Sequence, residues 1–270
     1  MTVYETLTAT SFAAVLRGEI ATAFSRDVIE ADGVDTVKFL HSQLSQDIAS
    51  MGAADVRWSF LLQPTGKLVG LLRVVRGDGD RFTLDTDPGS GQAVFDALSR
   101  FKIRTKCDLH LRTDQVFGAT WAEKLPVITA DVASISFGEE VSALASIVRG
   151  FPVWGAELND STIPNATGVV ALAASFTKGC YTGQELVERI DSRGGNVPRR
   201  LVGLDFSGLT TADRGTSLNA SGHVVGTVTR VATDPRTALS VALAYVKREV
   251  LDGAEIQDGS GLTAEVRDLS

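Results

Sequence analysis

Two short apolar runs and a third short segment, separated by turn residues, dominate the first third of the chain and limit the folds open to it. The apolar runs are VRWSFLL (56–62) and LVGLLRVVR (68–76), with Pro64 and Gly66 between them, and the turn GDGD (77–80) leads to RFTLDTD (81–87). Apolar runs of this length, bounded by Gly and Pro, predict strands joined by turns. We therefore expect three neighbouring antiparallel strands in this part of the chain.

Helical periodicity flanks these strands. Val37, Leu40, Leu44 and Ile48 recur at three- and four-residue steps, which predicts a helix with Asp32 as its N-cap, Asp35 at its third position and Gly52 at its end. Other segments are expected as a strand at 18–31, helices at 89–100, 139–149 and from 182 to Gly194, and a half-buried strand at 102–112 with Cys107 in the core. The mixture indicates an α+β fold.

The character of the sequence changes near Arg199. LVGLDFSG, HVVGTVTRVAT, ALSVALAYV and LTAEVRDL are short β-like runs separated by Gly, Asn, Asp and Pro. This composition is typical of a small β-barrel or sandwich. We therefore expect a separate β-rich region from residue 199 onward.

Charge and ligand counts argue against several functions. The chain carries 26 Lys and Arg against 33 Asp and Glu, a formal net charge of −7, which disfavours direct binding to nucleic-acid phosphates. Two cysteines and three widely spaced histidines are too few for a structural zinc or all-protein iron–sulfur site, which takes about four ligands. The N-terminus does not resemble a signal peptide, and no apolar stretch approaches the roughly 20 residues that span a bilayer. We expect a soluble cytoplasmic protein without its own metal site and without direct nucleic-acid or membrane contact.

The segment SFTKGCYTGQELVERIDSRGG (175–195) concentrates the reactive residue types. Thr182 and Glu185 have the spacing of a capping box, which predicts that a helix begins there. Cys180 would lie two residues before the cap, near the positive end of the helix, with Lys178 two residues away, and both features favour a thiolate. A purely structural interpretation stays open, in which Glu185 is only a cap and Cys180 only a packed small side chain.

Other residues of this segment support the helix and the loop before it. Glu185 precedes Arg189 by four residues, the favourable order for a helical ion pair. Gly179 and Gly183 allow a close backbone approach or a positive φ beside the thiol. Arg193, before Gly194, is a candidate cap for the helix end.

The run from Lys178 to Glu185, KGCYTGQE, resembles the K-G-C-Y-x-G-Q-E signature of the YgfZ family, whose members are relatives of the glycine-cleavage aminomethyltransferase. The similarity covers nearly the whole chain. It extends to FLHSQLSQDI (39–48), LLQPTGKLVGLLRVVR (61–76), RGFPVWGAEL (149–158), RRLVGL (199–204) and GTVTR (226–230).

The resemblance implies an α+β, aminomethyltransferase-like folate-binding fold, with two α+β units around a central cleft and a small C-terminal β-barrel. Residues 1–198 would form the folate-binding region and residues 199–270 the barrel. Within the first region, residues 1–52 with 115–198 would build one of two intertwined subdomains, and residues 53–114 the other.

The resemblance also implies a function. Family members support the assembly or repair of iron–sulfur clusters in client enzymes, including tRNA-modifying ones, so folate and iron–sulfur client or assembly proteins are the expected partners. The expected cofactor is tetrahydrofolate or a derivative, and Cys180 would be the functional thiol, with a transient iron–sulfur cluster as its cargo. The folate would be bound by residues of the signature and its helix, namely Lys178, Gly179, Tyr181, Gly183, Gln184, Glu185 and Arg189.

Two candidate folate-binding residues lie outside the signature. Lys67 follows the turn at Gly66, where a cation facing a cleft would help to hold folate carboxylates; a solvated surface lysine is the alternative. Many relatives carry a Glu within the two positions that follow Ile163-Pro164, whereas this chain has Asn165 there. An amide still offers the pterin both a donor and an acceptor.

Two other functions stay open. The first is a tetrahydrofolate-dependent aminomethyltransferase, which moves a one-carbon unit from a carrier-bound aminomethyl group and needs a carboxylate near the folate but no thiol. The second is a non-catalytic interaction scaffold. Because the signature contains a cysteine, the preferred hypothesis is the accessory protein, which resembles aminomethyltransferases without being a conventional enzyme.

Overall fold

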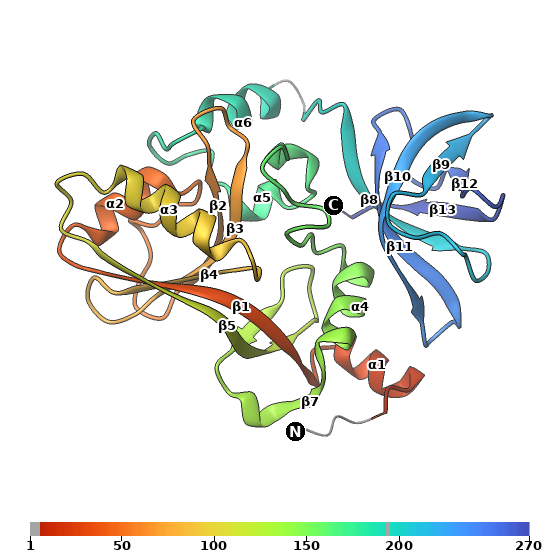
Figure 1. Ribbon diagram of the computed structural model, residues 1–270, viewed down its shortest axis with the longest axis horizontal. Helices are drawn as coiled ribbons and strands as arrows, with labels where there is room; N and C mark the ends of the chain where they lie inside the picture. The colour runs from red at the N-terminus through yellow and green to blue at the C-terminus, as the bar shows by residue number, and fades with distance from the viewer. Residues whose placement is uncertain (1–5, 193–194, 270) are drawn as a thin grey trace. The chain divides into compact units, whose positions relative to one another are not determined.

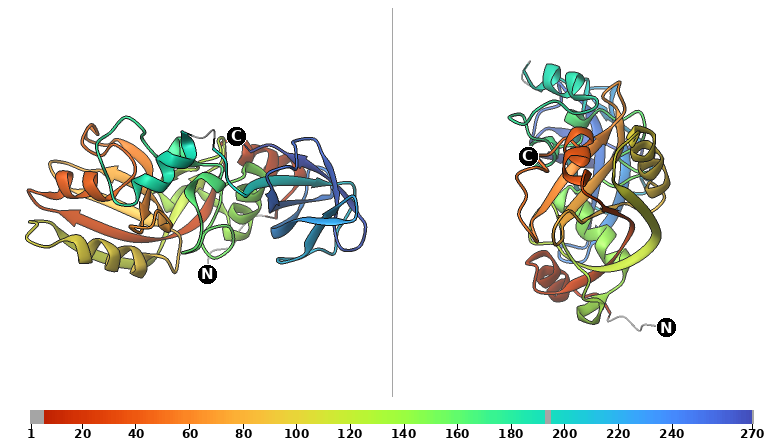
Figure 2. Two further views of the ribbon diagram at one scale, coloured as in Figure 1. Left: turned by 90° about the horizontal axis from the view of Figure 1, so that it is seen from above. Right: turned by 90° about the vertical axis from the view of Figure 1, so that its left-hand side faces the viewer.

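The computed structural model describes residues 6–192 and 195–269, and it divides into two compact units (Figures 1 and 2). Unit 1 comprises Met1–Phe24, Val116–Pro152 and Val197–Ser270. Unit 2 comprises Ser25–Gln115 and Val153–Asn196. This division differs from the expected one, because it groups residues 25–52 and 153–196 with the region around 53–114. The expected boundaries of the two intertwined subdomains stay a prediction.

The three expected strands are present in unit 2. They are β2 (Val56–Leu62), β3 (Leu68–Arg76) and β4 (Phe82–Thr86), paired antiparallel in that order. The turn between β2 and β3 is closed by Gln63, whose N–H donates to the Lys67 carbonyl at 2.8 Å. Gly66 adopts φ +80°, a conformation that glycine takes without steric cost. The local turn chemistry therefore predicts this hairpin correctly.

Four more strands complete the sheet. They are β1 (Ala21–Asp32), β5 (Asp108–Thr120), β6 (Val127–Thr129) and β7 (Ile135–Phe137), and the sheet order is β2-β3-β4-β1-β5-β6, with β7 paired to β1. The strand expected at 18–31 is confirmed as β1. The strand expected at 102–112 starts later, because residues 102–107 form turns and a loop before β5. Cys107 is buried, at 1% exposure, as expected.

Alternation along β3 and β4 gives the unit-2 sheet two different faces. Leu72 and Val74 of β3 and Leu84 of β4 belong to the apolar core of unit 2. Arg73, between Leu72 and Val74, and Asp85, next to Leu84, are cross-strand neighbours and point the other way. One face of these strands is therefore apolar, and the opposite face carries buried charge.

The first helix of unit 2 is shorter than the periodicity predicts. β1 continues to Asp32, and α2 runs only over Thr36–Gln43, with Asp35 at its N-cap. The predicted N-cap at Asp32 and the predicted end at Gly52 are therefore wrong. The apolar residues after the helix, Leu44 and Ile48, are nevertheless buried in the same core. Apolar residues thus remain buried in the irregular segment after α2. Their spacing in the sequence therefore resembled that of a longer helix.

The remaining helices are short. The structure contains α1 (Ala9–Leu16), α3 (Gly91–Phe101), η1 (Val132–Ser134), α4 (Glu139–Arg149), η2 (Pro164–Ala166), α5 (Val170–Ala173) and α6 (Gln184–Asp191). The helices expected at 89–100 and 139–149 are confirmed as α3 and α4. Gly150 ends α4 with φ +74°, a left-handed C-cap. Residues 193 and 194, where the end of the last helix was expected, lie outside the described residues.

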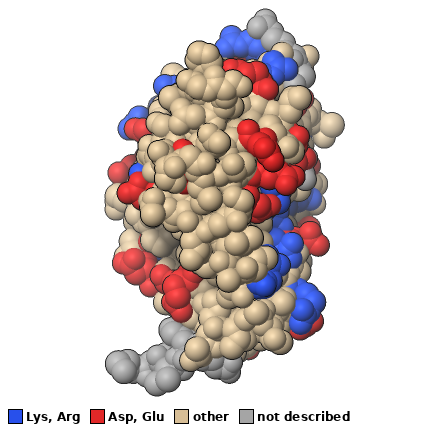
Figure 3. Space-filling model, turned by 90° about the vertical axis from the view of Figure 1, so that its right-hand side faces the viewer, with Lys and Arg blue, Asp and Glu red and all other residues tan. Residues whose placement is uncertain are grey.

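The C-terminal strands close into a barrel. They are β8 (Arg199–Phe206), β9 (Ser217–Ala220), β10 (His223–Asp234), β11 (Leu239–Lys247), β12 (Glu255–Gln257) and β13 (Thr263–Arg267), in the order β10-β11-β8-β13-β12-β9. Its interior is an apolar cluster that includes Val202, Leu218 and Val266. On the face seen in Figure 3, uncharged side chains cover the centre and charged ones gather at the margins. The expected α+β fold with a C-terminal β-barrel is confirmed.

Candidate functional site

The cysteine loop, residues 175–183, runs alongside the end of α2. The N–H of Ser175 donates to the Ser45 carbonyl at 2.9 Å, and the N–H of Thr182 donates to the Ser42 carbonyl at 3.2 Å. Between these two anchors Cys180 is exposed to solvent. The loop is therefore fixed at both ends and presents its thiol on the surface of unit 2.

The Lys178 side chain also connects the loop to α2 and to the residues just after it. Its ammonium donates to three main-chain carbonyls, those of His41, Leu44 and Gln46. It also lies 5.0 Å from the centre of the Tyr181 ring, a cation–π distance. Carbonyls at the end of a helix carry partial negative charge and favour a cation. The hydrogen bonds of Lys178 thus go to the last turn of α2 and to the residues just after it, and they hold the loop in place.

Burial changes the proton affinity of Lys178. Loss of water around the ammonium lowers the pKa of Lys178 to about 8, and the nearby Asp47 carboxylate opposes that shift. Near neutral pH the side chain is still largely charged and can donate all three hydrogen bonds. A moderately alkaline solution would titrate it.

The two glycines of the loop differ in their surroundings. Gly179 is exposed, and a Cβ placed there would have no atom within 4 Å. Gly183 has φ +79°, and a Cβ there would lie 2.4 Å from the Gln63 carbonyl oxygen and 3.2 Å from the Gly66 Cα. The hairpin turn therefore packs directly on the backbone of Gly183, as was expected for a glycine that permits close approach.

The start of α6 differs from the predicted capping box. Gly183 is the N-cap and has no side chain to accept the first N–H groups, and α6 starts at Gln184. The Thr182 hydroxyl instead donates to the Gln43 amide oxygen at 3.2 Å, and the Glu185 side chain is 92% exposed. The positive φ of Gly183 and its packing against the hairpin override the local pattern. Cys180 consequently lies four residues before the first helical residue.

Side chains of α6 hold the loop from the other end. The Gln184 amide oxygen accepts from the N–H of Tyr181 at 3.1 Å, and its nitrogen donates to Glu188. The predicted ion pair between Glu185 and Arg189 is confirmed at 3.8 Å, on the exposed side of the helix. Such pairs add only a few tenths of a kcal/mol. Gln184 is thus the residue of α6 that fixes the loop.

Two polar atoms beside α6 are buried without a partner among the described residues. They are the hydroxyl oxygen of Tyr181 and the amide oxygen of Asn165. Tyr181 is 6% exposed, and burial, with Glu188 in support, raises its pKa to about 12. The amide nitrogen of Asn165 donates to the Val187 carbonyl at 3.4 Å. Buried polar atoms of this kind need an explanation, and a missing ligand is one.

Lys67 joins this region through the hairpin. Its side chain is exposed, next to Gly66, and a Cβ on Gly66 would lie 2.4 Å from the Leu186 Cβ of α6. Figure 1 shows the tip of the β2–β3 hairpin beside α6. The structure therefore brings the hairpin turn, the cysteine loop, η2 and α6 together in unit 2. Arg193, which was expected to cap the helix, lies outside the described residues.

A buried charge network in unit 2 was not anticipated from the sequence. Arg26 is fully buried, and its Nε donates to Asp85 at 2.8 Å, while a second nitrogen donates to Asp87. Arg73 donates to the other Asp85 oxygen at 2.7 Å, and the N–H of Trp154 donates to Asp87 at 2.7 Å. The alternation of charged with apolar residues in β3 and β4 was the available signal. It would have placed Arg73 and Asp85 on one face.

No metal centre is evident in the part of the chain that the structure describes. Within residues 6–192 and 195–269, no three His, Cys, Asp or Glu side chains are grouped so that they could hold a metal ion. Over the same residues, no helix has the length and apolar character to cross a membrane.

The fold defines the class of protein. Glycine cleavage system aminomethyltransferase T from Bartonella henselae matches the structure with a TM-score of 0.81, over 100% of this chain and 91% of that one, at 17% sequence identity. Residues 199–268 match the glycine cleavage T-protein C-terminal barrel domain. The chain therefore has the aminomethyltransferase-like fold, complete with its C-terminal barrel.

Sequence similarity narrows this class. The chain is 31% identical to the tRNA-modifying protein YgfZ of Cronobacter sakazakii over 61% of its length. It is 28% identical to an uncharacterized Haemophilus influenzae protein over 63% of its length, and 34% identical to a Nostoc aminomethyltransferase over 43%. These alignments span 64%, 67% and 29% of the respective relatives. With the barrel match, these similarities support membership of the YgfZ family.

Proposed function

We propose that this chain is a folate-binding accessory protein that supports the assembly or repair of iron–sulfur clusters in client enzymes, with Cys180 as its functional thiol. One observation carries the proposal: Cys180 is exposed on a loop whose end residues are hydrogen-bonded to Ser42 of α2 and to Ser45 just after it. A thiol that reacts with a partner has to be accessible. A loop that is already ordered loses little entropy when the partner binds.

The buried polar atoms beside α6 fit a pterin ring. Tyr181 remains protonated, because its pKa is raised to about 12, so its hydroxyl can donate to a ring nitrogen or carbonyl. The Asn165 amide oxygen can accept from an amino group. A hydrogen bond from the ligand to each of these atoms would recover part of the desolvation cost of leaving it unpaired, about 1–3 kcal/mol. Folate, when bound, would supply a carrier of one-carbon units.

The other predicted folate-binding residues take supporting roles in this proposal. Gln184 fixes the main chain at Tyr181, and Gly183 lets the hairpin turn approach. Lys67, exposed at that turn, would attract the carboxylates of a folate tail. Gly179 leaves the space around the thiol open, and Glu185 and Arg189 are paired on the outer side of α6.

An iron–sulfur cluster would be cargo of this protein. Cys180 can contribute one thiolate, whereas a cluster takes about four. Within the described residues, no group of metal-ligating side chains surrounds it. The remaining ligands would therefore come from a client protein or from a small thiol.

Replacement of Cys180 tests the role of the thiol. In cells that lack the endogenous protein, Cys180→Ser should fail to restore the activity of iron–sulfur client enzymes while the purified variant melts like the wild type. Cys107→Ala removes the buried thiol and should restore activity to the extent that it folds. Full client activity with Cys180→Ser would overturn the proposal.

Two assays separate the alternatives. Calorimetry with tetrahydrofolate should show saturable binding; no binding at high micromolar ligand would favour a scaffold that does not use folate. Incubation with a lipoylated aminomethyl carrier and tetrahydrofolate should give no sustained turnover. Robust turnover would identify an aminomethyltransferase instead.

A further inference from the structure

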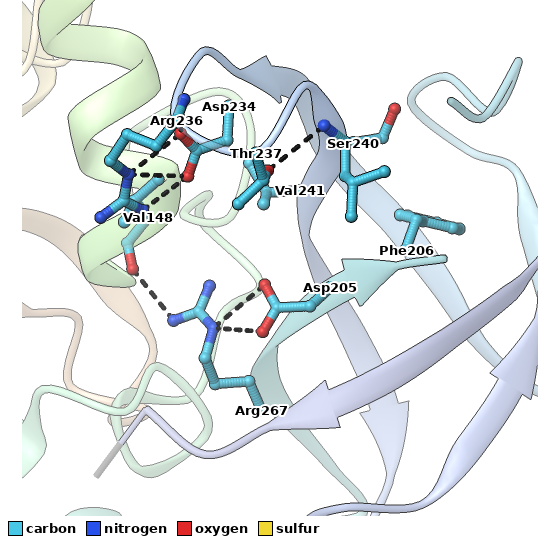
Figure 4. A pocket seen from close by; sticks show the side chains of 10 residues that line it. Val148, Asp205, Phe206, Asp234, Arg236, Thr237, Ser240, Val241 and Arg267 are labelled. Atoms are coloured by element: carbon cyan, nitrogen blue, oxygen red, sulfur yellow. Dashed lines mark hydrogen bonds and ion pairs between the residues drawn. The ribbon is translucent and has the colours of Figure 1, made fainter. Parts of the chain in front are cut away.

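A pocket lies in unit 1, outside every segment used above. Its volume is about 320 Å³, near the lower limit for small-molecule sites. It is bounded by the end of α4, by β8 and β13, and by the turn between β10 and β11. Its lining residues are Val148, Asp205, Phe206, Asp234, Arg236, Thr237, Leu239, Ser240, Val241 and Arg267 (Figure 4).

Guanidinium groups gather at this pocket. Arg236 and Arg267 line it, and Arg149 follows the lining residue Val148. Burial lowers the pKa of Arg149; Glu123 opposes this shift, and the positive charges of Arg236 and Arg267 add to it. Arg149 donates to main-chain carbonyls, those of Trp121 and Leu16. These three cations are therefore within electrostatic reach of one another.

Both arginines that line the pocket are paired with aspartates, and this limits the charge that a ligand can carry. Arg236 is bound through two of its nitrogens to Asp234, and Nε of Arg267 is 3.1 Å from Asp205. A ligand with two negative charges would be repelled by Asp205 and Asp234. A single negative charge suits a pocket in which each lining arginine already has one aspartate.

One donor in the pocket is unused. Arg267 donates through Nη1 to the Val148 carbonyl at 2.9 Å, whereas its Nη2 is buried and has no partner within the described residues. Figure 4 shows the guanidinium directed toward the space below Arg236 and Asp234. Gly203 makes room for this arrangement, because a Cβ there would lie 2.7 Å from both Cζ and Nη2 of Arg267. The backbone of β8 thus accommodates a guanidinium that retains a free N–H group.

The rest of the lining is largely apolar. Val148, Phe206, Leu239 and Val241 contribute to it. We propose that this pocket binds a small organic monocarboxylate, with its carboxylate on Nη2 of Arg267 and its apolar part against Phe206 and Val241. Arginine presents N–H groups in the geometry that a carboxylate accepts. Apolar burial would supply the rest of the affinity.

Benzoate is a suitable probe, with its neutral isostere benzamide and inorganic phosphate for comparison. Amide chemical shifts and thermal unfolding of the full chain should show saturable binding of benzoate, with shifts concentrated at residues 148, 203–206, 237–241 and 267. Benzamide and phosphate should bind at least about tenfold more weakly. Equal binding of benzamide, or shifts spread evenly over the surface, would overturn the assignment.

Two variants and one control locate the site. Arg267→Gln should weaken benzoate binding at least about tenfold, a loss typical for a charged hydrogen bond. Gly203→Ala keeps all charges but displaces the guanidinium, and should weaken binding without loss of fold. Arg214→Gln removes an exposed barrel arginine and should leave binding unchanged. If Arg267→Gln does not fold, Gly203→Ala decides: undiminished binding in that variant contradicts the proposal.

Discussion

Gly66 and Gly183 lie in contact, and each can do so only because it has no side chain. A Cβ on Gly183 would lie 3.2 Å from the Gly66 Cα, and a Cβ on Gly66 would lie 3.1 Å from the Gly183 carbonyl oxygen. Both residues have a positive φ, +80° and +79°. The β2–β3 hairpin and the cysteine loop therefore meet backbone to backbone, which places the predicted Lys67 near the start of α6.

The glycine contact predicts a large difference between two similar substitutions. Gly183→Ala should lower the free energy of unfolding by at least about 2 kcal/mol, because the new Cβ collides with Gln63 and the φ is unfavourable. Gly179→Ala, in the same loop, should change it by less than about 0.5 kcal/mol, because nothing lies near its Cβ. Urea denaturation of both variants measures this; equal losses would show that the contact is not formed.

Lys178 predicts a pH dependence of stability. Its pKa is about 8 in the folded chain, against an ordinary value of 10.5. Between these values the unfolded chain binds more protons than the folded chain, so the free energy of unfolding should rise with pH across this window. Below about pH 8 the contribution of Lys178 is constant.

Lys178→Met isolates this contribution. The rise between about pH 8 and 10.5 should be smaller in Lys178→Met than in the wild type, because the titrating group is gone. Lys67→Met changes an exposed lysine and should keep the wild-type slope. Denaturant titrations at several pH values give the slopes. Wild-type behaviour of Lys178→Met would contradict the burial of this ammonium.

The two cysteines should differ in reactivity in the folded protein. Cys180 is exposed and should be alkylated by iodoacetamide without unfolding. Cys107 is 1% exposed, and burial raises the pKa of its thiol. Its alkylation should be at least about a hundredfold slower, because it requires the chain to open. Mass spectrometry after timed quenching separates the two; rapid labelling of both would contradict the burial of Cys107.

The buried charge network predicts a costly substitution. Asp85→Asn should lower the free energy of unfolding by about 3–5 kcal/mol, because Arg26 and Arg73 both donate to that carboxylate inside the unit. Asp80→Asn makes the same chemical change at a surface pair 3.9 Å from Arg76 and should cost less than about 1 kcal/mol. Thermal or urea unfolding distinguishes them, and a mild Asp85→Asn would refute the dependence of the sheet on this carboxylate.

Tyr181→Phe separates a ligand-binding role from a structural one. The hydroxyl has no partner within the described chain, so its removal should leave stability unchanged or raise it by up to about 1 kcal/mol. Affinity for tetrahydrofolate should fall about fivefold or more if the hydroxyl binds the pterin. Tyr245→Phe, in the barrel, should not affect the affinity. Unchanged affinity of Tyr181→Phe would remove this residue from the proposed folate site.

The parts of the fold that depend on local pattern were predicted well. β2, β3 and β4 follow from apolar runs and turn residues, and α4 follows from its periodicity and from Gly150. The predicted start of α6 was wrong. The spacing of Thr182 and Glu185 predicts a capping box only for a helix whose first residues make no other contacts. In the structure the contact of Gly183 with the hairpin decides where the helix begins, and such a contact leaves no mark in the local sequence.

The contacts of the cysteine loop also depend on residues that are distant in the sequence. Sequence spacing placed Lys178 beside Cys180, but its ammonium donates to carbonyls 132 to 137 residues earlier in the chain. The pair of Arg26 with Asp85 likewise depends on which strands become neighbours, since 59 residues separate them. Burial of Cys107 was predicted correctly, although the residue lies in the loop just before β5 and not in the strand.

The division of the chain has a consequence for its synthesis. The polypeptide passes between the two units at residues 24/25, 115/116, 152/153 and 196/197. On a ribosome, all residues of unit 2, including the cysteine loop, have been made once residue 196 has emerged, while unit 1 still lacks its barrel. The half of the protein that carries the thiol can thus be completed first, and a stalled or truncated chain would expose that thiol before its companion unit has formed.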